Sequence, residues 1–221
     1  MKNIKRVFGW KLVACLLIVS GCATTRQSGI DTATKHIDKM ERIANQRFMN
    51  DFSKFDGVGL ISLGKAGALG IGGVGWKGTV FVRDQDTGQF GPPSFIGSGG
   101  FSIGLAYAGI TAVDCLLLFL NREDAIEFAK RKININFTNE ATFGIWGRKQ
   151  MTTSKARFFS DGAGLSVGAI ELEFLFGGPL NKLHKNLYHD SVTVEQILNG
   201  EVAVPREIVD VLKKLNLLMV N

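Results

Sequence analysis

The stretch Gly100-Phe-Ser-Ile-Gly-Leu-Ala-Tyr-Ala108 decides the fold that we predict for this chain. Large apolar residues occupy positions 101, 103, 105 and 107, and glycine, serine or alanine occupies every position between them. Such strict alternation is typical of a β-strand with one apolar face and one nearly bare face. Because glycine weakens a strand, its repeated use indicates a sharp bend or a second backbone pressed close.

The same alternation of small and apolar residues recurs at 68–72 and at 162–169. Strands of this kind predict a strongly curved, mostly antiparallel and barrel-like β-sheet, with its small residues on the crowded face. A flexible glycine-rich loop is the alternative, but loops do not alternate with large apolar residues in this way.

The order of the remaining elements predicts the α+β class. We expect a tether at 22–29, an N-terminal amphipathic helix at 30–55, an irregular polar segment at 134–147, and one domain over 30–221. Further strands are expected at 57–63, 67–74, 78–83, 113–120, 155–160 and 165–176, one inserted helix at 122–132, and C-terminal helices at 179–189, 194–198 and 205–218.

The first helix has apolar residues at three- and four-residue spacing from Ile30 to Phe55, and its other side mixes Lys and Arg with Asp and Glu. Mixed charges favour a solvated face over one that seeks lipid. We therefore expect this helix to pack on the sheet, and a helix that lies on a membrane surface is the alternative.

Residues 1–21 have a basic start, an apolar run at Leu12–Val19 and small residues after it, which is the pattern of a secretory signal peptide. Ile18-Val-Ser-Gly-Cys22 resembles the bacterial lipobox. That resemblance implies cleavage before Cys22, a diacylglyceryl thioether on its sulfur, palmitate or a similar acyl group on its new amine, and hence firm membrane anchoring. Ala23, which is not Asp, implies sorting to the outer membrane, on its periplasmic face. An ordinary signal peptide with a chance cysteine is the alternative.

Composition excludes several classes of protein. The 221 residues are 45% hydrophobic, which excludes a disordered chain, and the net charge of +6 falls to +2 once the four basic residues of 1–21 are removed. A charge of +2 is too small for a nucleic-acid-binding surface. Cys115 would be the one cysteine left unmodified, and its apolar surroundings in sequence predict a buried thiol, so we expect no disulfide and no metal site.

An ordered series of short motifs resembles the SYLF domain family over residues 30–218. It comprises Lys65-Ala-Gly67, Gly78-Thr-Val-Phe-Val-Arg83, Pro93-Ser-Phe95, Gly99-Gly-Phe-Ser-Ile-Gly104, Thr111-Ala-Val-Asp114, Gly144-Ile-Trp-Gly-Arg148, Gly164-Leu-Ser-Val-Gly168 and Glu195-Gln-Ile-Leu-Asn-Gly200. The resemblance implies lipid or membrane binding, most simply to anionic phospholipid, with no catalysis and no cofactor. Eukaryotic members bind phosphoinositides and actin filaments, and from these we carry over lipid binding alone.

Four basic residues are candidate contacts for a lipid head group. Lys65, Lys77 and Arg83 flank the glycine-rich strands, and Arg148 offers a planar guanidinium that suits phosphate. Asp114 is the one charged residue in an apolar run, and we favour a structural partner for it, such as Arg148, over a role as a site acid.

Two other functions stay open. The chain could be a tethered structural module that binds another envelope protein. It could also be a lipid hydrolase, because Gly100-Phe-Ser-Ile-Gly104 fits the G-x-S-x-G pattern, with Ser102 as nucleophile, His184 or His189 as base and Asp114 or Asp161 as orienter. We disfavour the hydrolase because the pattern lies within a predicted strand, whereas a nucleophile elbow joins a strand to a helix. Gly70-Ile-Gly-Gly-Val-Gly75 is likewise followed by strand residues, which argues against a dinucleotide site.

Overall fold

The computed structural model describes residues 25–46, 52–68, 71–104, 108–131, 133–139, 142–145, 149–152, 156–168, 171–189 and 192–220. The elements follow in the order α2 (Arg26–Gln46), β1 (Gly57–Ala68), β2 (Ile71–Val82), β3 (Ser94–Gly104), β4 (Ala108–Phe119), α3 (Arg122–Lys130), β5 (Ile133–Asn139), β6 (Thr142–Ile145), β7 (Lys149–Thr152), β8 (Ala156–Gly168), β9 (Glu171–Pro179), α4 (Asn181–Tyr188), α5 (Val194–Leu198) and α6 (Arg206–Val220). The predicted signal peptide, Cys22 and the first residues of the tether lie outside these ranges.

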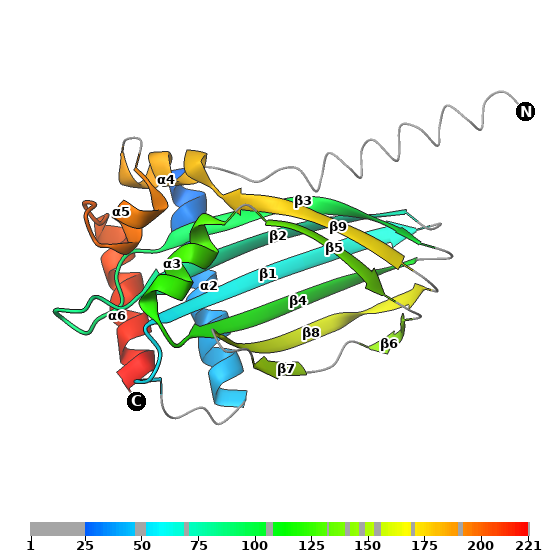
Figure 1. Cartoon of the computed structure of the whole chain (residues 1–221), viewed down its shortest axis with the longest axis horizontal. Helices are drawn as coiled ribbons and strands as arrows, with labels where there is room; N and C mark the ends of the chain where they lie inside the picture. The colour runs from blue at the N-terminus through cyan, green and yellow to red at the C-terminus, as the bar shows by residue number, and fades with distance from the viewer. Residues whose placement is uncertain are drawn as a thin grey trace, which may run out of the picture.

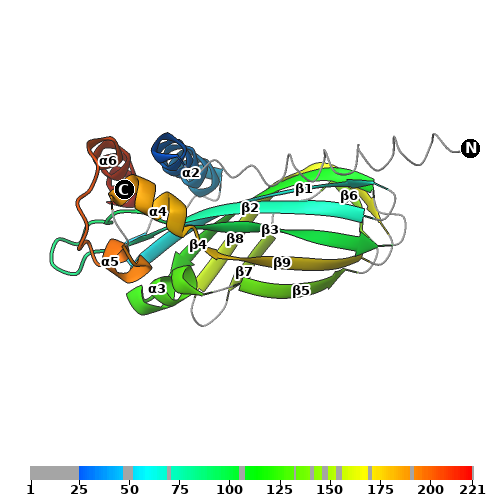
Figure 2. The same cartoon turned by 90° about the horizontal axis from the view of Figure 1, so that it is seen from above.

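The strands form one sheet in the order β5-β9-β3-β2-β1-β4-β8-β6, with β7 also paired to β8. Every pairing between these strands is antiparallel. The sheet is strongly curved (Figure 2), but it stays open, because β5 and β6 end the path. The predicted α+β class, with an N-terminal helix, one inserted helix and C-terminal helices around a curved antiparallel sheet, is confirmed.

Three predicted strands, at 67–74, 100–108 and 165–176, each span the end of one strand and the start of the next. The stretch 100–108 is not one strand, because β3 ends at Gly104 and β4 begins at Ala108, running in the opposite direction. In the same way 67–74 spans the end of β1 and the start of β2, which pair Gly67 with Gly72. Small and apolar residues alternate right through these reversals, so the pattern does not mark where the chain turns.

The prediction that 134–147 is irregular was wrong. Residues 133–139 form β5, which pairs with β9, and 142–145 form β6, which pairs with β8. Asn and Thr at every second position made this segment look like a loop. An edge strand tolerates such residues, because backbone pairing with its neighbour compensates for weak β-propensity.

Helix α2 packs on the sheet, as we expected. Its apolar stripe is buried, with Ala33, Ile37 and Met40 each 0% exposed. The helix ends at Gln46 rather than at residue 55, and Phe52 and Phe55 are buried in the connection to β1. The alternative of a helix spread on a membrane surface does not describe this structure, because the apolar stripe already forms part of the core.

The helices gather at one end of the sheet (Figure 1). Helices α2 and α6 cover one face, α3 covers the opposite face, and α4 and α5 lie between these two layers (Figure 2). The buried apolar residues of the described chain lie between Ile30 and Met219, so a protein that starts at Ala23 retains this whole core. The other ends of β1–β4 extend beyond the helices, and we call 64–68, 71–75, 99–104 and 108–112 the distal end of the sheet.

Candidate functional site

Three exposed apolar side chains share one face of the distal end. Ile110 pairs with Ala66, Ala66 with Gly73, and Gly73 with Phe101, which makes one row across β4, β1, β2 and β3. Directly paired residues project to the same face of a sheet. Ile71 lies two positions from Gly73 on β2 and so shares this face. Ile110 is 72% exposed, Ile71 53% and Phe101 40%.

Small residues lie between and beside these three side chains on β1, β2 and β4. Gly64, Ala66 and Ala112 are exposed and lie on the same face by register. We call Gly64, Ala66, Ile71, Gly73, Phe101, Ile110 and Ala112 the distal face. None of these residues is polar, and a contiguous exposed apolar surface marks a site of contact with lipid or with an apolar protein surface.

The opposite face of the distal end is buried. Lys65 pairs with Val74 and with Thr111, so the three side chains share that inner face, and they are 6%, 1% and 3% exposed. None of the described helices reaches this end (Figures 1 and 2), and within the described part of the chain the curved sheet itself covers its inner face. The distal face is therefore the outer surface of a curled sheet.

The structure does not bring the predicted basic residues together. Lys65 is buried on the inner face, whereas Lys77 pairs with Ser62 and lies on the outer face beside α2. Arg83 lies at the helical end, where its guanidinium donates to the carbonyls of Phe55 at 3.3 Å and Gly88 at 2.5 Å. Arg148 and Cys22 lie outside the described residues. Lipid contact by these four basic residues stays a prediction, but those described offer no common surface.

Arg83 has a structural explanation of its own. It also donates to the carbonyl of Phe52 at 3.5 Å, and its guanidinium carbon lies 4.5 Å from the centre of the Phe90 ring. These contacts close the loop between β2 and β3, which the carboxylate of Asp84 also stabilises by accepting from the backbone of Asp86 and Thr87. The residue therefore has its charge and its donors engaged at the end of the molecule away from the distal face.

Asp114 joins α2 to the sheet. Its carboxylate accepts from Lys39 Nζ at 2.7 Å, Ser62 Oγ at 2.6 Å and Arg42 Nη2 at 3.0 Å. Burial alone would raise the pKa of Asp114, but these hydrogen bonds and the two positive charges outweigh it, so its pKa lies below the ordinary value. Asp114 thus has the structural role that we favoured. Its partners among the described residues come from α2 and β1, and Arg148 lies outside those residues.

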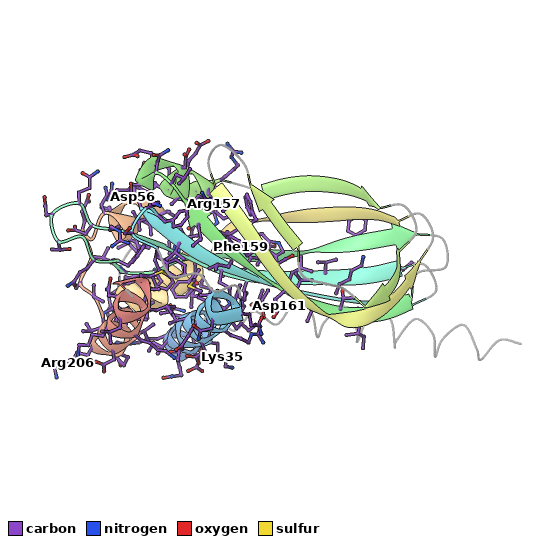
Figure 3. The ribbon with its side chains drawn as sticks, turned by 90° about the horizontal axis from the view of Figure 1, so that it is seen from below. Lys35, Asp56, Arg157, Phe159, Asp161 and Arg206 are labelled. Carbon is purple, nitrogen blue, oxygen red and sulfur yellow. The ribbon has the colours of Figure 1, made fainter. Side chains whose placement is uncertain are left out.

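The residues of the hydrolase alternative do not form a triad. His184 is fully buried, and its Nε2 accepts from the backbone of Phe95 at 2.7 Å. Ser102 lies seven residues further along β3, about 20 Å away at the rise of a strand. Asp161 lies beside the end of α2, 3.6 Å from Arg42 (Figure 3), and His189 lies 3.4 Å from Arg26. These candidates are dispersed over the molecule.

The described residues offer little other site chemistry. Within those ranges no three His, Cys, Asp or Glu residues are grouped so that they could hold a metal ion. Burial raises the pKa of Cys115 to about 11, which keeps its thiol protonated and weakly nucleophilic. Among the helices that the structure describes, none combines the length and apolar character that crossing a bilayer requires.

A comparison with models of protein families identifies the family of this chain. A family model, Ysc84, described as Las17-binding protein actin regulator, matches residues 99–217, which is more than half of the chain. The chain belongs to the Ysc84 family. This is the family of SYLF domains, so the resemblance seen in the sequence is confirmed. No curated protein and no solved structure matches the chain significantly.

The Ysc84 match begins within β3 and ends within α6, so it includes Phe101 and Ile110 of the distal face. Ysc84 domains are in general lipid-binding or actin-regulating, and generally non-catalytic. Our sequence reasoning did not select the distal face. The only trace of the distal face in the sequence is apolar residues within strands, and most strands have such residues. The alternation does not indicate which end of a strand the described helices leave uncovered.

Proposed function

We propose that this protein is a membrane-anchored lipoprotein whose Ysc84 domain binds phospholipid through the distal face and catalyses no reaction. The observation that supports the proposal best is the group of exposed side chains Ile110, Phe101 and the neighbouring Ile71 on the distal face, whose residues as defined above are all apolar and uncharged. An exposed apolar surface of this kind loses unfavourable contact with water when it meets acyl chains.

The N-terminal sequence supports the anchor. Cys22 ends a lipobox-like segment and precedes Thr25, the first described residue, by three positions. Three extended residues span at most about 10 Å, so acyl chains on Cys22 would hold the start of α2 close to the bilayer. The proposed location is the outer membrane, with the domain on its periplasmic face.

The anchor and the distal face can act on one membrane. Helix α2 contacts Ser62 and Asp114, which lie on the same face of the sheet as Ala66 and Ala112. Both features therefore lie on one side of the sheet (Figure 2). Anchoring raises the local concentration of lipid around the distal face, so a contact that is weak by itself becomes effective.

Two experiments test the proposal. Intact-mass analysis of the protein extracted from membranes should show residues 1–21 removed and Cys22 acylated, and a Cys22→Ser variant should lose that mass. A protein of residues 23–221, which retains the core, should co-sediment with phospholipid vesicles. If it is folded by circular dichroism and stays in the supernatant with every vesicle, lipid binding is refuted, and a tethered module for an envelope protein becomes the better explanation.

A further inference from the structure

A second surface lies at the helical end, between α3, α4 and α5. It is a groove of about 550 Å³, and its lining includes Lys130 from α3, Lys182 and Lys185 from α4, and Glu195 from α5. Val192, Val194 and Pro179 add apolar walls. The groove is thus basic at its rim and partly apolar inside.

Its positive charge is only partly balanced. Lys130 forms an ion pair with Glu195, so the one carboxylate among the lining residues is already engaged. Lys182 and Lys185 are both exposed and lie three positions apart on α4, which places them side by side. Among the described residues no ion pair involves either lysine. Two neighbouring ammonium groups with no counter-ion in the described part of the chain suit an anion that can contact both.

The groove lies close to the proposed anchor. The side of α4 away from the groove packs on the first turns of α2, where a Cβ on Gly29 would lie 3.2 Å from Leu183. Arg26, the first residue of α2, contacts His189 at the end of α4. One helix, about 10 Å across, therefore separates the groove from the start of α2 (Figure 2).

We propose that this groove binds the phosphate of an anionic phospholipid in the bilayer that holds the anchor. The inference rests on the proposed function, and it assigns the head group to lysines other than the basic residues predicted from the sequence, Lys65, Lys77, Arg83 and Arg148. The two lysines favour a phosphate because its charge is opposite to theirs. The apolar walls suit the glycerol and the first methylenes of a lipid. The neighbouring anchor favours a lipid over a free phosphate, because it fixes the groove near a dense layer of head groups.

The test compares a Lys182→Gln/Lys185→Gln variant of residues 23–221 with a control that loses the same charge elsewhere, Lys35→Gln/Lys213→Gln. Lys35 is exposed on α2 (Figure 3), and Lys213 is 70% exposed on α6. Each protein is mixed with vesicles of phosphatidylcholine alone and with vesicles that also contain phosphatidylglycerol. The groove variant should lose about thirtyfold in affinity for the anionic vesicles only, and the control should lose much less.

The neutral vesicles separate this inference from the proposed function, since they report on the distal face. Equal losses in both variants would show a general surface attraction and overturn the groove. A second measurement does not depend on vesicles: short-chain phosphatidylglycerol, kept below its micellar concentration, is titrated while amide shifts of α4 are followed by NMR. Shifts in the unmodified protein that vanish in the groove variant support the site. No shifts, or equal affinity for glycerol phosphate, overturn it.

Discussion

Replacing the three exposed apolar side chains of the distal face should abolish most vesicle binding. The triple variant Ile71→Thr/Phe101→Thr/Ile110→Thr changes the chemistry of that face and keeps residues that strands accept. Because the three side chains are 53%, 40% and 72% exposed, they contribute little to the core, and we expect the variant to unfold at nearly the same temperature as the unmodified protein.

The size of the effect follows from the exposed fractions. Complete burial of an Ile or Phe side chain is worth about 1.5–3 kcal/mol. The exposed fractions of the three side chains together correspond to between one and two whole side chains. Transfer of that surface from water into lipid then contributes about 3 kcal/mol to the free energy of binding. The methyl groups of the three introduced threonines keep part of this contribution. We expect the vesicle partition coefficient to fall by about 30- to 100-fold.

The assay is co-sedimentation of residues 23–221 with phosphatidylcholine vesicles over a range of lipid concentrations. The matched control is Val209→Thr/Leu217→Thr on α6, where two apolar side chains are 39% and 68% exposed away from the distal face. The control should bind like the unmodified protein. If the triple variant binds as well as the control while both stay folded, the distal face is not the lipid contact, and the argument from exposed apolar area is refuted.

Three further predictions concern stability. Asp114→Asn should lower the free energy of unfolding in urea by about 2 kcal/mol, because it weakens charged hydrogen bonds to α2; an unchanged value would mean that these contacts do not stabilise α2. Gly177→Ala should lower the free energy of unfolding by about 1–3 kcal/mol, because the new Cβ would lie 2.7 Å from a backbone oxygen of β3. Gly64→Ala is the control, since a Cβ there has nothing within 4 Å and should leave the free energy of unfolding unchanged. Equal effects of the two substitutions would contradict the close approach at Gly177. Burial lowers the pKa of His184 from 6.5 in the unfolded chain to about 4 in the folded protein. Between pH 6.5 and pH 4 this histidine is therefore protonated more in the unfolded chain than in the folded protein, and the free energy of unfolding should fall as the pH drops through this range. His184→Gln should flatten that fall in urea titrations at each pH, and a slope equal to that of the unmodified protein would contradict it.

Much of the fold could be predicted because local patterns there agree with the tertiary structure. The stripe Ile30, Ala33, Ile37, Met40 and Ala44 was read from helical spacing, and each of these residues is buried. The glycine-rich alternation correctly indicated a curved sheet. Glycine elsewhere in the sheet also permits close packing, since a Cβ on Gly177 would lie 2.5 Å from the indole of Trp76. Patterns failed where they continue through a chain reversal, as between β3 and β4.

The candidate sites were harder to predict because each combines residues that are distant in the chain. The basic residues at 65, 77 and 83 lie on or next to the consecutive strands β1 and β2. Lys65 pairs with Val74, and Lys77 lies an odd number of positions from Val74, so Lys65 and Lys77 project from opposite faces of the sheet. The groove takes Lys130 from the inserted helix and Lys182 from a helix some fifty positions later. No spacing rule relates such residues before the helices are packed.

By itself, the sequence determined the element types over most of the chain, the α+β class, the family and the lipobox-like segment before Cys22, because periodicity and short motifs are properties of adjacent residues. Only the tertiary structure decided which ends of β1–β4 the helices leave bare, that Ile71, Phe101 and Ile110 share one exposed face, and that the lysines of α3 and α4 meet in a groove. These depend on strand register and helix packing, which are set by burial of the whole core rather than by any local run of residues.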